Sequence, residues 1–281
     1  MLNIKQKLNR KSLKKFFKNF YYTVVDFKMI FFHIFKKTIN DKDFIILTGA
    51  NSDYFDKLVN LLNSINLYEK NIITKIYNLG LSQNQINFLK NNFPENFVIV
   101  EFEFHNYPEF VSKVDSSNKL GSYAWKPIII FNEYKNSKNL IWLDAGCVVT
   151  KNLKLLKKLI LKYGYFSPLS SDKVKNWTHP NTIQKLNFPN KYLNRRNFQA
   201  GTLGFSVENE EVNNLINLWY KHSLDKNVIA PDGSSRFNHR QDQAVLTLLI
   251  YLCKLENSTL RTLKMFGIKI HEKNVKLNNI L

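Results

Sequence analysis

The chain has 281 residues, of which 44% are hydrophobic, so it is long enough for one large globular domain and too apolar for an extended disordered protein. Its two cysteines, Cys147 and Cys253, both lie in apolar runs, which excludes a disulfide framework and predicts a reducing, cytoplasmic compartment. The formal net charge is +19, but Lys and Asn recur along the whole chain, so charge alone does not identify an anionic partner.

The first 40 residues form a basic segment that differs from the rest of the chain. They contain ten Lys or Arg residues and a single acid, Asp26. On a helical wheel the large apolar side chains share one face, and these are Leu13, Phe16, Phe17, Phe20, Val24, Phe27, Phe31, Ile34 and Phe35. Because Lys18, Asp26 and Lys28 interrupt the apolar run, we expect no membrane span but a helix lying peripherally on an anionic membrane at its cytoplasmic face. A first helix packed on the domain is the alternative.

Residues 41–281 show the alternation of an α/β domain. Short apolar runs predict strands at 43–49, 71–77, 97–104 and 140–143, and helical patterns follow at about 51–65 and 82–92. Strands separated by single helices favour a parallel sheet with helices on both faces. We therefore expect two parts, a basic helical segment at 1–40 and an α/β domain at 41–281. Thr48 and Asn51 then lie near the carboxyl end of the first strand.

Asp144 is the candidate around which the other site residues are placed. It follows the apolar run at 140–143, and open α/β sheets bind ligands at the carboxyl ends of their strands. Ala145 and Gly146 have almost no side chain, so a ligand can approach this turn closely. The alternative is that Asp144 caps a helix expected at 152–162.

Two later segments also combine small and polar residues. In the first, Gly201 allows close approach of the backbone, and Gln199 offers amide groups to hydroxyls, although a plain turn into a core strand explains the same residues. The second, at 230–243, is rich in turn residues and precedes an apolar helix at 244–252. There Arg240 can clamp a phosphate with paired donors, while Asp242 can serve as a helix cap.

Four short motifs carry a resemblance to a known family. Tyr123-Ala-Trp-Lys-Pro127 and Trp142-Leu-Asp-Ala-Gly146, followed by the Ala-Gly segment at 200–201 and Asp242-Gln243, resemble the nucleotide-diphospho-sugar glycosyltransferases of the GT-A fold. The chain is similar to glycosyltransferase family 8 and to a poorly characterised group with Trp-Lys-Pro and Trp-Leu-Asp-Ala-Gly motifs. The resemblance implies a Rossmann-like α/β fold with a mixed, mainly parallel sheet flanked by helices.

The resemblance also implies roles for individual residues. In family 8 the strand ends in Asp-x-Asp, whose carboxylates hold a divalent cation, Mn²⁺ or Mg²⁺. Here Asp144 keeps the first position and Gly146 stands at the second, with His239 and His271 as candidates for a further metal ligand. Asp242 and Gln243 are the expected catalytic residues. The expected donor-binding residues are Thr48, Asn51, Tyr123, Lys126, Ala145, Gly146, Gln199, Gly201, His239 and Arg240.

The implied activity is transfer of a hexose-like sugar from a nucleotide-sugar donor. The basic N-terminal helix, which would place the site at a membrane face, favours a glycan or lipid-linked acceptor and surface polysaccharide synthesis. A metal at Asp144, with Lys126 or Arg240, would stabilise the leaving diphosphate. Gly146 keeps open a second hypothesis, a degenerate relative that only binds glycan. A nucleic-acid-binding protein is the third, but the basic residues cluster in the first 40 and no zinc-finger, RNP or helix-turn-helix signature occurs, so we expect no nucleic-acid partner.

Overall fold

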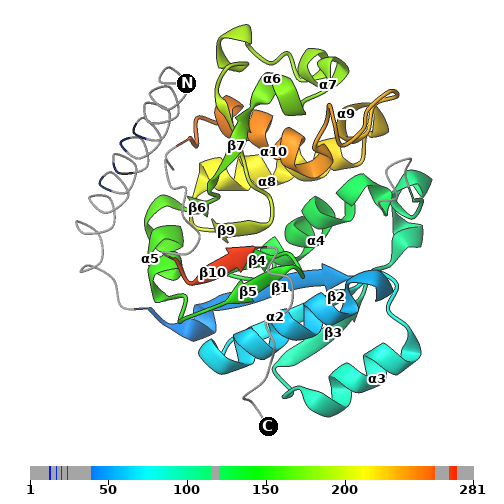
Figure 1. Ribbon diagram of the computed structural model, residues 1–281, viewed down its shortest axis with the longest axis vertical. Helices are drawn as coiled ribbons and strands as arrows, with labels where there is room; N and C mark the ends of the chain where they lie inside the picture. The colour runs from blue at the N-terminus through cyan, green and yellow to red at the C-terminus, as the bar shows by residue number, and fades with distance from the viewer. Residues whose placement is uncertain are drawn as a thin grey trace, which may run out of the picture.

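A six-stranded sheet organises the protein in the computed structural model (Figure 1). The structure describes residues 39–114, 120–256 and 266–270, together with the helical positions Leu13, Phe17, Phe20 and Val24. The strands of this sheet, in spatial order, are β3 (Phe97–Glu101), β2 (Ile73–Asn78), β1 (Phe44–Ala50), β4 (Asn139–Leu143), β9 (Thr202–Ser206) and β6 (Tyr165–Phe166).

The sheet is mixed and mainly parallel, which confirms the predicted fold class. β3, β2, β1 and β4 are mutually parallel, whereas β9 runs antiparallel to both of its neighbours. The chain moves outward from β1 through β2 to β3 and then returns to the other side of β1 with β4. The order of the strands therefore reverses between β1 and β4. Open α/β sheets bind ligands at such a switch point, outside the carboxyl ends of the strands.

Helices cover both faces of the sheet (Figure 1). The longer ones are α2 (Phe55–Tyr68), α3 (Gln83–Asn92), α4 (Trp125–Tyr134), α5 (Lys154–Tyr163), α8 (Glu210–Ser223) and α10 (Gln241–Leu252), and the short ones are α6 (Val174–Trp177), α7 (Pro180–Lys185) and α9 (Lys226–Ile229). Single 3₁₀ turns occur at Asp41–Asp43, Ser52–Tyr54, Phe104–Asn106, Glu109–Val111, Gly121–Tyr123 and Asn190–Tyr192. Two small antiparallel pairs complete the fold: β5 (Cys147–Val149) with β10 (Ile268–Ile270), and β7 (Leu169–Lys173) with β8 (Arg196–Phe198).

The alternation of side chains along β4 separates two hydrophobic cores. Leu140 and Trp142 are buried with α4, α8 and α10, whereas Ile141 and Leu143 are buried with α2 and α5. Successive residues of a strand point to opposite faces, so an acidic side chain two residues after Trp142 belongs on the side of α4 and α10. This alternation positions Asp144.

Most predicted elements are present, with shifted ends. The strand predicted at 97–104 stops at Glu101, because Phe104–Asn106 forms a 3₁₀ turn. α3 begins with a capping box in which Ser82 and Gln85 bond each other's backbone, as its sequence favours. The helix predicted at 152–162 is α5, and Gly164, in the left-handed conformation, directly follows its last residue.

The predicted N-terminal amphipathic helix lies largely outside the described residues, and this includes Phe16, Phe27, Phe31, Ile34 and Phe35. The four described positions, Leu13, Phe17, Phe20 and Val24, are helical, and their side chains are 48–61% exposed. Their spacing places them on one helix face. None of the helices among the described residues combines the length and hydrophobicity that crossing a bilayer requires. The division of the chain at residue 40 stays a prediction.

Candidate active site at the carboxyl ends of β1 and β4

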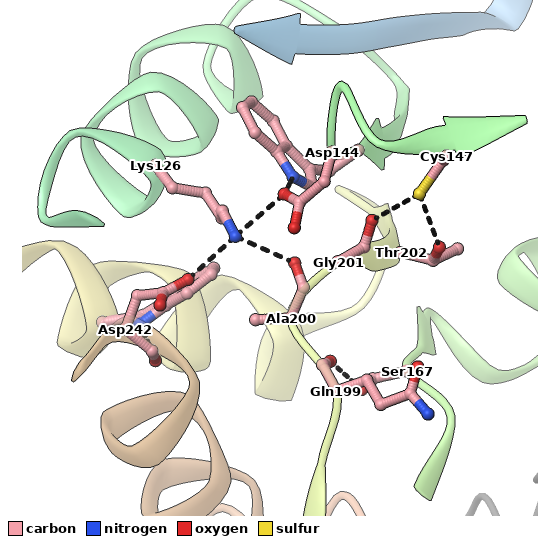
Figure 2. A network of polar contacts seen from close by, with 11 residues as sticks. Lys126, Asp144, Cys147, Ser167, Gln199, Ala200, Gly201, Thr202 and Asp242 are labelled. Atoms are coloured by element: carbon pink, nitrogen blue, oxygen red, sulfur yellow. Dashed lines mark hydrogen bonds and ion pairs between the residues drawn. The ribbon is translucent and has the colours of Figure 1, made fainter. Parts of the chain in front are cut away.

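The ammonium group of Lys126 lies between two carboxylates at the switch point of the sheet (Figure 2). Its Nζ is 3.0 Å from Oδ1 of Asp144 and 2.9 Å from Oδ2 of Asp242, and it donates a hydrogen bond to the carbonyl oxygen of Ala200 at 3.2 Å. The side chains of Lys126 and Asp242 are only 4% and 7% exposed, whereas that of Asp144 is 38% exposed. We call Lys126, Asp144 and Asp242 the bridged carboxylate cluster.

Lys126 reaches this position because α4 starts immediately after a tight turn. Gly121, Ser122 and Tyr123 all have positive φ, at 54°, 48° and 62°. A Cβ at Gly121 would lie 2.2 Å from the carbonyl oxygen of Val111, so glycine alone fits there. The turn directs the first residues of α4 toward the strand ends. Lys126 is therefore buried rather than solvated at the start of α4.

Asp144 presents its two oxygens differently. Oδ1 accepts a hydrogen bond from Nε1 of Trp142 at 2.7 Å and also pairs with Lys126. The backbone N–H of Asp144 donates to the carbonyl oxygen of Gly201 at 2.9 Å, and a Cβ at Gly201 would lie 3.1 Å from Oδ2. The missing side chain of Gly201 thus leaves space beside Oδ2. Asp144 does not cap α5, because β5 lies between them and Leu153 is the residue before the helix.

Asp242 comes from the first turn of α10 and faces Lys126 rather than capping the helix. Arg240 is the residue at the cap position, and it makes no capping hydrogen bond with its side chain. Gln241, directly before Asp242, has a positive φ of 39°. The backbone carbonyl of Asp242 accepts a hydrogen bond from Nε1 of Trp219 at 3.1 Å, which fixes this turn against α8. Gln243 follows with its Nε2 buried and without a hydrogen-bond partner.

The charges of the cluster depend on one another. Burial by itself would lower the pKa of Lys126, but the carboxylates of Asp144 and Asp242 outweigh burial and raise that pKa above its ordinary value. Burial raises the pKa of Asp242, and Lys126 acts in the opposite direction. Lys126 therefore stays protonated at neutral pH and is the cation that keeps two neighbouring carboxylates together.

His239 is not part of the bridged carboxylate cluster, and its contacts do not support the predicted role in binding a metal or the donor. It is fully buried, its Nδ1 accepts a hydrogen bond from the backbone N–H of His179 at 3.2 Å, and its Nε2 donates to the carbonyl oxygen of Ile229 at 3.0 Å. Burial lowers its pKa to about 4, so the ring is neutral. Both nitrogens are engaged, and His239 anchors the loop before α10 instead.

Arg240 stacks on an aromatic ring next to the cluster. Its guanidinium carbon is 4.4 Å from the ring centroid of Trp177, and its backbone N–H donates to the carbonyl oxygen of Trp177 at 3.0 Å. Trp177 ends α6, and its partnership with Arg240 was not predicted. Stacking holds a guanidinium in a fixed orientation while leaving its N–H groups at the edge available as donors.

The remaining predicted donor-binding residues lie in or after β1, before α4 and after β4. Thr48 lies near the carboxyl end of β1, two residues before Ala50, and it is fully buried. Asn51 is half-buried directly after β1. The ring of Tyr123 is centred 5.8 Å from Nζ of Lys126, and burial raises the pKa of its hydroxyl. Ala145 and Gly146 form the turn between Asp144 and β5.

Gln199 points away from the bridged carboxylate cluster. Its Nε2 donates to the carbonyl oxygen of Leu169 at 3.2 Å, and its backbone carbonyl oxygen accepts from Oγ of Ser167 at 2.6 Å. Figure 2 shows Gln199 beside Ser167, while the next residue, Ala200, turns its carbonyl toward Lys126. The segment therefore contributes its backbone to the site, and the prediction of a donor-binding amide at Gln199 is not supported by its contacts.

The described residues do not make a metal site. No three His, Cys, Asp or Glu side chains come together among them in a way that could hold an ion. Asp144 has Oδ1 engaged by Trp142 and Lys126, Gly146 offers no side-chain ligand, and His239 has no free nitrogen. His271, the other predicted metal ligand, lies outside the described residues. The oxygen-rich ligand set that Mn²⁺ or Mg²⁺ requires is absent from this part of the chain.

Comparisons with known proteins give a partial family match. A family described as a protein of unknown function (DUF1647) matches residues 4–131, which is less than half of the chain. No curated protein matches the sequence.

Solved structures give a match to the fold. Core-mannan synthase A from Aspergillus fumigatus, in its Mn/GDP form, aligns with a TM-score of 0.52 at 11% identity over 76% of this chain and 70% of that chain. The galactosyltransferase LgtC, in complex with donor and acceptor sugar analogues, aligns with a TM-score of 0.44 at 16% identity over 73% and 69%. For the bifunctional glycosyltransferase WbbM the TM-score is 0.45 at 15% identity over 76% of this chain, which spans 38% of that protein. The chain has the GT-A-like α/β fold of glycosyltransferases.

Proposed function

We propose that the protein is a glycosyltransferase that transfers a sugar from a nucleotide-diphospho-sugar. The observation that carries this proposal is the bridged carboxylate cluster, because it brings Asp144 and Asp242 together at the switch point of a GT-A-like sheet. Burying Lys126 and Asp242 here costs stability that well-packed apolar residues would not cost. Their position, where such sheets bind ligands, indicates that the purpose is recognition of a polar substrate.

The donor sugar would lie against the turn that joins β4 and β5. Oδ2 of Asp144 faces the space left by Gly201 and can accept a hydrogen bond from a sugar hydroxyl. The small residues Ala145 and Gly146 let the ligand approach the backbone, and Asn51 lies at the end of the neighbouring strand. We place the sugar at Asp144 and the nucleotide toward β1.

Transfer of the sugar creates positive charge at the sugar carbon and negative charge on the leaving diphosphate. A carboxylate held beside the sugar stabilises the first, and preorganised cations stabilise the second. Asp144 is the more exposed carboxylate and is our candidate for contact with the sugar, whereas Asp242 is buried and acts through Lys126. Gln243, one residue further along α10, has an unpartnered amide that can orient a hydroxyl.

The acceptor in this proposal is a glycan or a lipid-linked sugar. The names of core-mannan synthase A and of the LgtC complex with donor and acceptor sugar analogues refer to sugar transfer. Their low identity to this chain restricts the comparison to the fold. Support for a lipid-linked acceptor comes from the basic first 40 residues and the exposed apolar face of Leu13, Phe17, Phe20 and Val24. Synthesis of a surface polysaccharide would fit both.

A thermal-shift screen of the full-length protein against UDP, GDP, CMP and ADP tests the function. A nucleotide at a hundredfold excess over its Kd stabilises the folded state by about 2.7 kcal/mol. For a chain of this size that corresponds to a rise in Tm of roughly 5–10 °C. Asp144→Asn should reduce the rise, whereas Asp43→Asn, which removes a surface ion pair with Lys138, should not. If no nucleotide raises the Tm, a non-enzymatic glycan-binding protein becomes the better hypothesis.

Peripheral binding to the cytoplasmic face of an anionic membrane is part of the proposal. The apolar face would enter the interface, and the surrounding lysines would contact the lipid headgroups. Cosedimentation of the full-length protein with phosphatidylserine-containing vesicles at low salt measures this binding. Replacing Phe17 and Phe20 by Ser should release the protein from the vesicles, while equal binding of the variant would mean that this face contacts protein instead.

A further inference from the structure

The carboxylates at the switch point already have a cation of their own. Lys126 pairs with Asp144 at 3.0 Å and with Asp242 at 2.9 Å, from a side chain that is 4% exposed. A divalent ion that bound both carboxylates would have to displace this ammonium group, whose pKa the same carboxylates raise. Lys126 and Trp142 both engage Oδ1 of Asp144, which leaves its Oδ2, beside Gly201, and one oxygen is a poor site for a metal ion.

A second cation stands next to the cluster with no anion to balance it. Arg240 forms no ion pair with a carboxylate among the described residues, and its Nε is buried without a hydrogen-bond partner. Asp172, the carboxylate whose charge acts on Arg240, is instead bonded to the backbone of Lys173 and the amide of Asn176. The stacked ring of Trp177 fixes the guanidinium. A fixed, unbalanced guanidinium is a ready donor for a phosphate group.

Arg240 is close to the cluster along the chain. Consecutive Cα atoms lie 3.8 Å apart, so Arg240 and Asp242 are separated by at most about 7.6 Å at their Cα atoms. Their loop is well anchored, since the buried ring of His239 bonds the backbone of both His179 and Ile229. A diphosphate attached to a sugar at Asp144 therefore meets a rigidly held arginine rather than a mobile one.

We propose that donor binding needs no divalent cation: Lys126 takes the place of a metal ion in holding Asp144 and Asp242, and Arg240 binds the diphosphate directly. This inference rests on the proposed function and specifies how that site recognises its donor. It accounts for Gly146, because a site that binds phosphate through Arg240 has no use for a second metal-binding carboxylate after Asp144. It also gives Trp177 a role, as the support of the arginine.

Two measurements on the full-length protein test the proposal. First, the Kd of the nucleotide found by thermal shift is measured with chelator and with Mn²⁺, and we expect the two values to agree within about twofold. Arg240→Gln removes a charge-assisted hydrogen bond and should weaken binding by about 10- to 100-fold. Arg195→Gln is the matched control, because Arg195 also stacks on rings, those of Tyr192 and Tyr251, but lies near Glu256.

Second, the electron paramagnetic resonance signal of free Mn²⁺ reports metal binding without any nucleotide. Wild-type protein should leave the signal unchanged, while Lys126→Ala should reduce it, because two carboxylates without their ammonium group attract a divalent ion. Nucleotide binding that requires Mn²⁺, or Mn²⁺ binding by the wild-type protein alone, overturns the inference and leaves the proposed function intact. Failure to bind any nucleotide under either condition overturns both.

Discussion

Removing the ammonium group of Lys126 gives the sharpest test of how the cluster is held. Lys126→Met keeps a long, flexible side chain but deletes the charge that faces Asp144 and Asp242. Asp242 would then be a carboxylate at 7% exposure with no cation, and Asp144 would keep its hydrogen bond from Trp142 and its partial access to water. The destabilisation therefore comes mainly from Asp242.

The expected loss is large. Removing one partner of a buried ion pair lowers the free energy of unfolding by about 3–5 kcal/mol, because the other charge stays buried and unpaired. Domains have total stabilities of about 5–15 kcal/mol, so this is a substantial share. For a chain of this length each kcal/mol changes the Tm by roughly 2–4 °C, and the Tm of Lys126→Met should fall by roughly 6–20 °C.

Urea denaturation of three variants distinguishes the stability lost with the charge of Lys126 from the stability lost with its packing contacts. Lys126→Met/Asp242→Asn removes both members of the buried pair, and we expect it to recover most of the loss, since no buried charge remains. Lys138→Met is the control: it breaks the exposed pair with Asp43, whose lysine is 69% exposed, and should change stability by less than about 1 kcal/mol.

The change in stability of Lys126→Met with pH is an independent test of the same explanation. The pKa of Asp242 is already raised by burial against the opposing effect of Lys126, and deleting Lys126 raises it further. A carboxyl group with a raised pKa binds protons more tightly in the folded state, so the variant should regain stability as the pH falls toward that pKa. Equal losses in Lys126→Met and the double variant, with no dependence on pH, would refute this explanation and assign the loss to packing.

Three further predictions follow from single contacts. Trp142→Phe removes the hydrogen bond to Oδ1 of Asp144, which is worth about 1 kcal/mol, and leaves a cavity in the core, so the free energy of unfolding in urea should fall by more than about 1 kcal/mol. Gly201→Ala places a Cβ 3.1 Å from Oδ2, so calorimetry should show weaker nucleotide binding with a change in stability of less than about 1 kcal/mol. Burial lowers the pKa of His239 from 6.5 to about 4, so the stability that its neutral ring contributes is present above pH 6.5 and lost as the pH falls through 4. The loss should reach about 3 kcal/mol. Urea titrations at several pH values, with His239→Gln as the comparison, measure it.

The strands and the position of Asp144 were predictable because both follow from local patterns. Apolar runs between polar spacers gave β1, β2, β3 and β4, and the carboxylate after β4 could be placed at the ligand-binding edge by the geometry of parallel sheets. Asp242 was placed at the start of an apolar helix by the turn-rich segment before it, and it lies in the first turn of α10. What the pattern did not reveal was that Lys126 joins them, because a lysine at a helix start looks solvated until the preceding turn is known.

Contacts between distant segments account for the errors. His239 looked like a ligand because its neighbours are polar, but the backbone of His179, 60 positions earlier, and of Ile229, 10 positions earlier, takes both of its nitrogens. Arg240 owes its orientation to Trp177, which is 63 positions earlier, as their shared backbone hydrogen bond shows. One signal was available: Trp142 and Asp144 are two residues apart at a strand end, so their side chains share a face and can bond.

Strain beside the cluster argues that it is kept for recognition rather than stability. Tyr123 lies three residues before Lys126 with φ at 62°, and Gln241 directly precedes Asp242 with φ at 39°. Such conformations in residues other than glycine each cost about 1–3 kcal/mol, and they persist where the surroundings hold them. Apolar residues often replace a buried ion pair without loss of stability. Two strained turns converge on the buried Lys126 and Asp242 and on the partly exposed Asp144, so they add to the cost of folding. They are explained if these charges must meet a ligand at the end of β4.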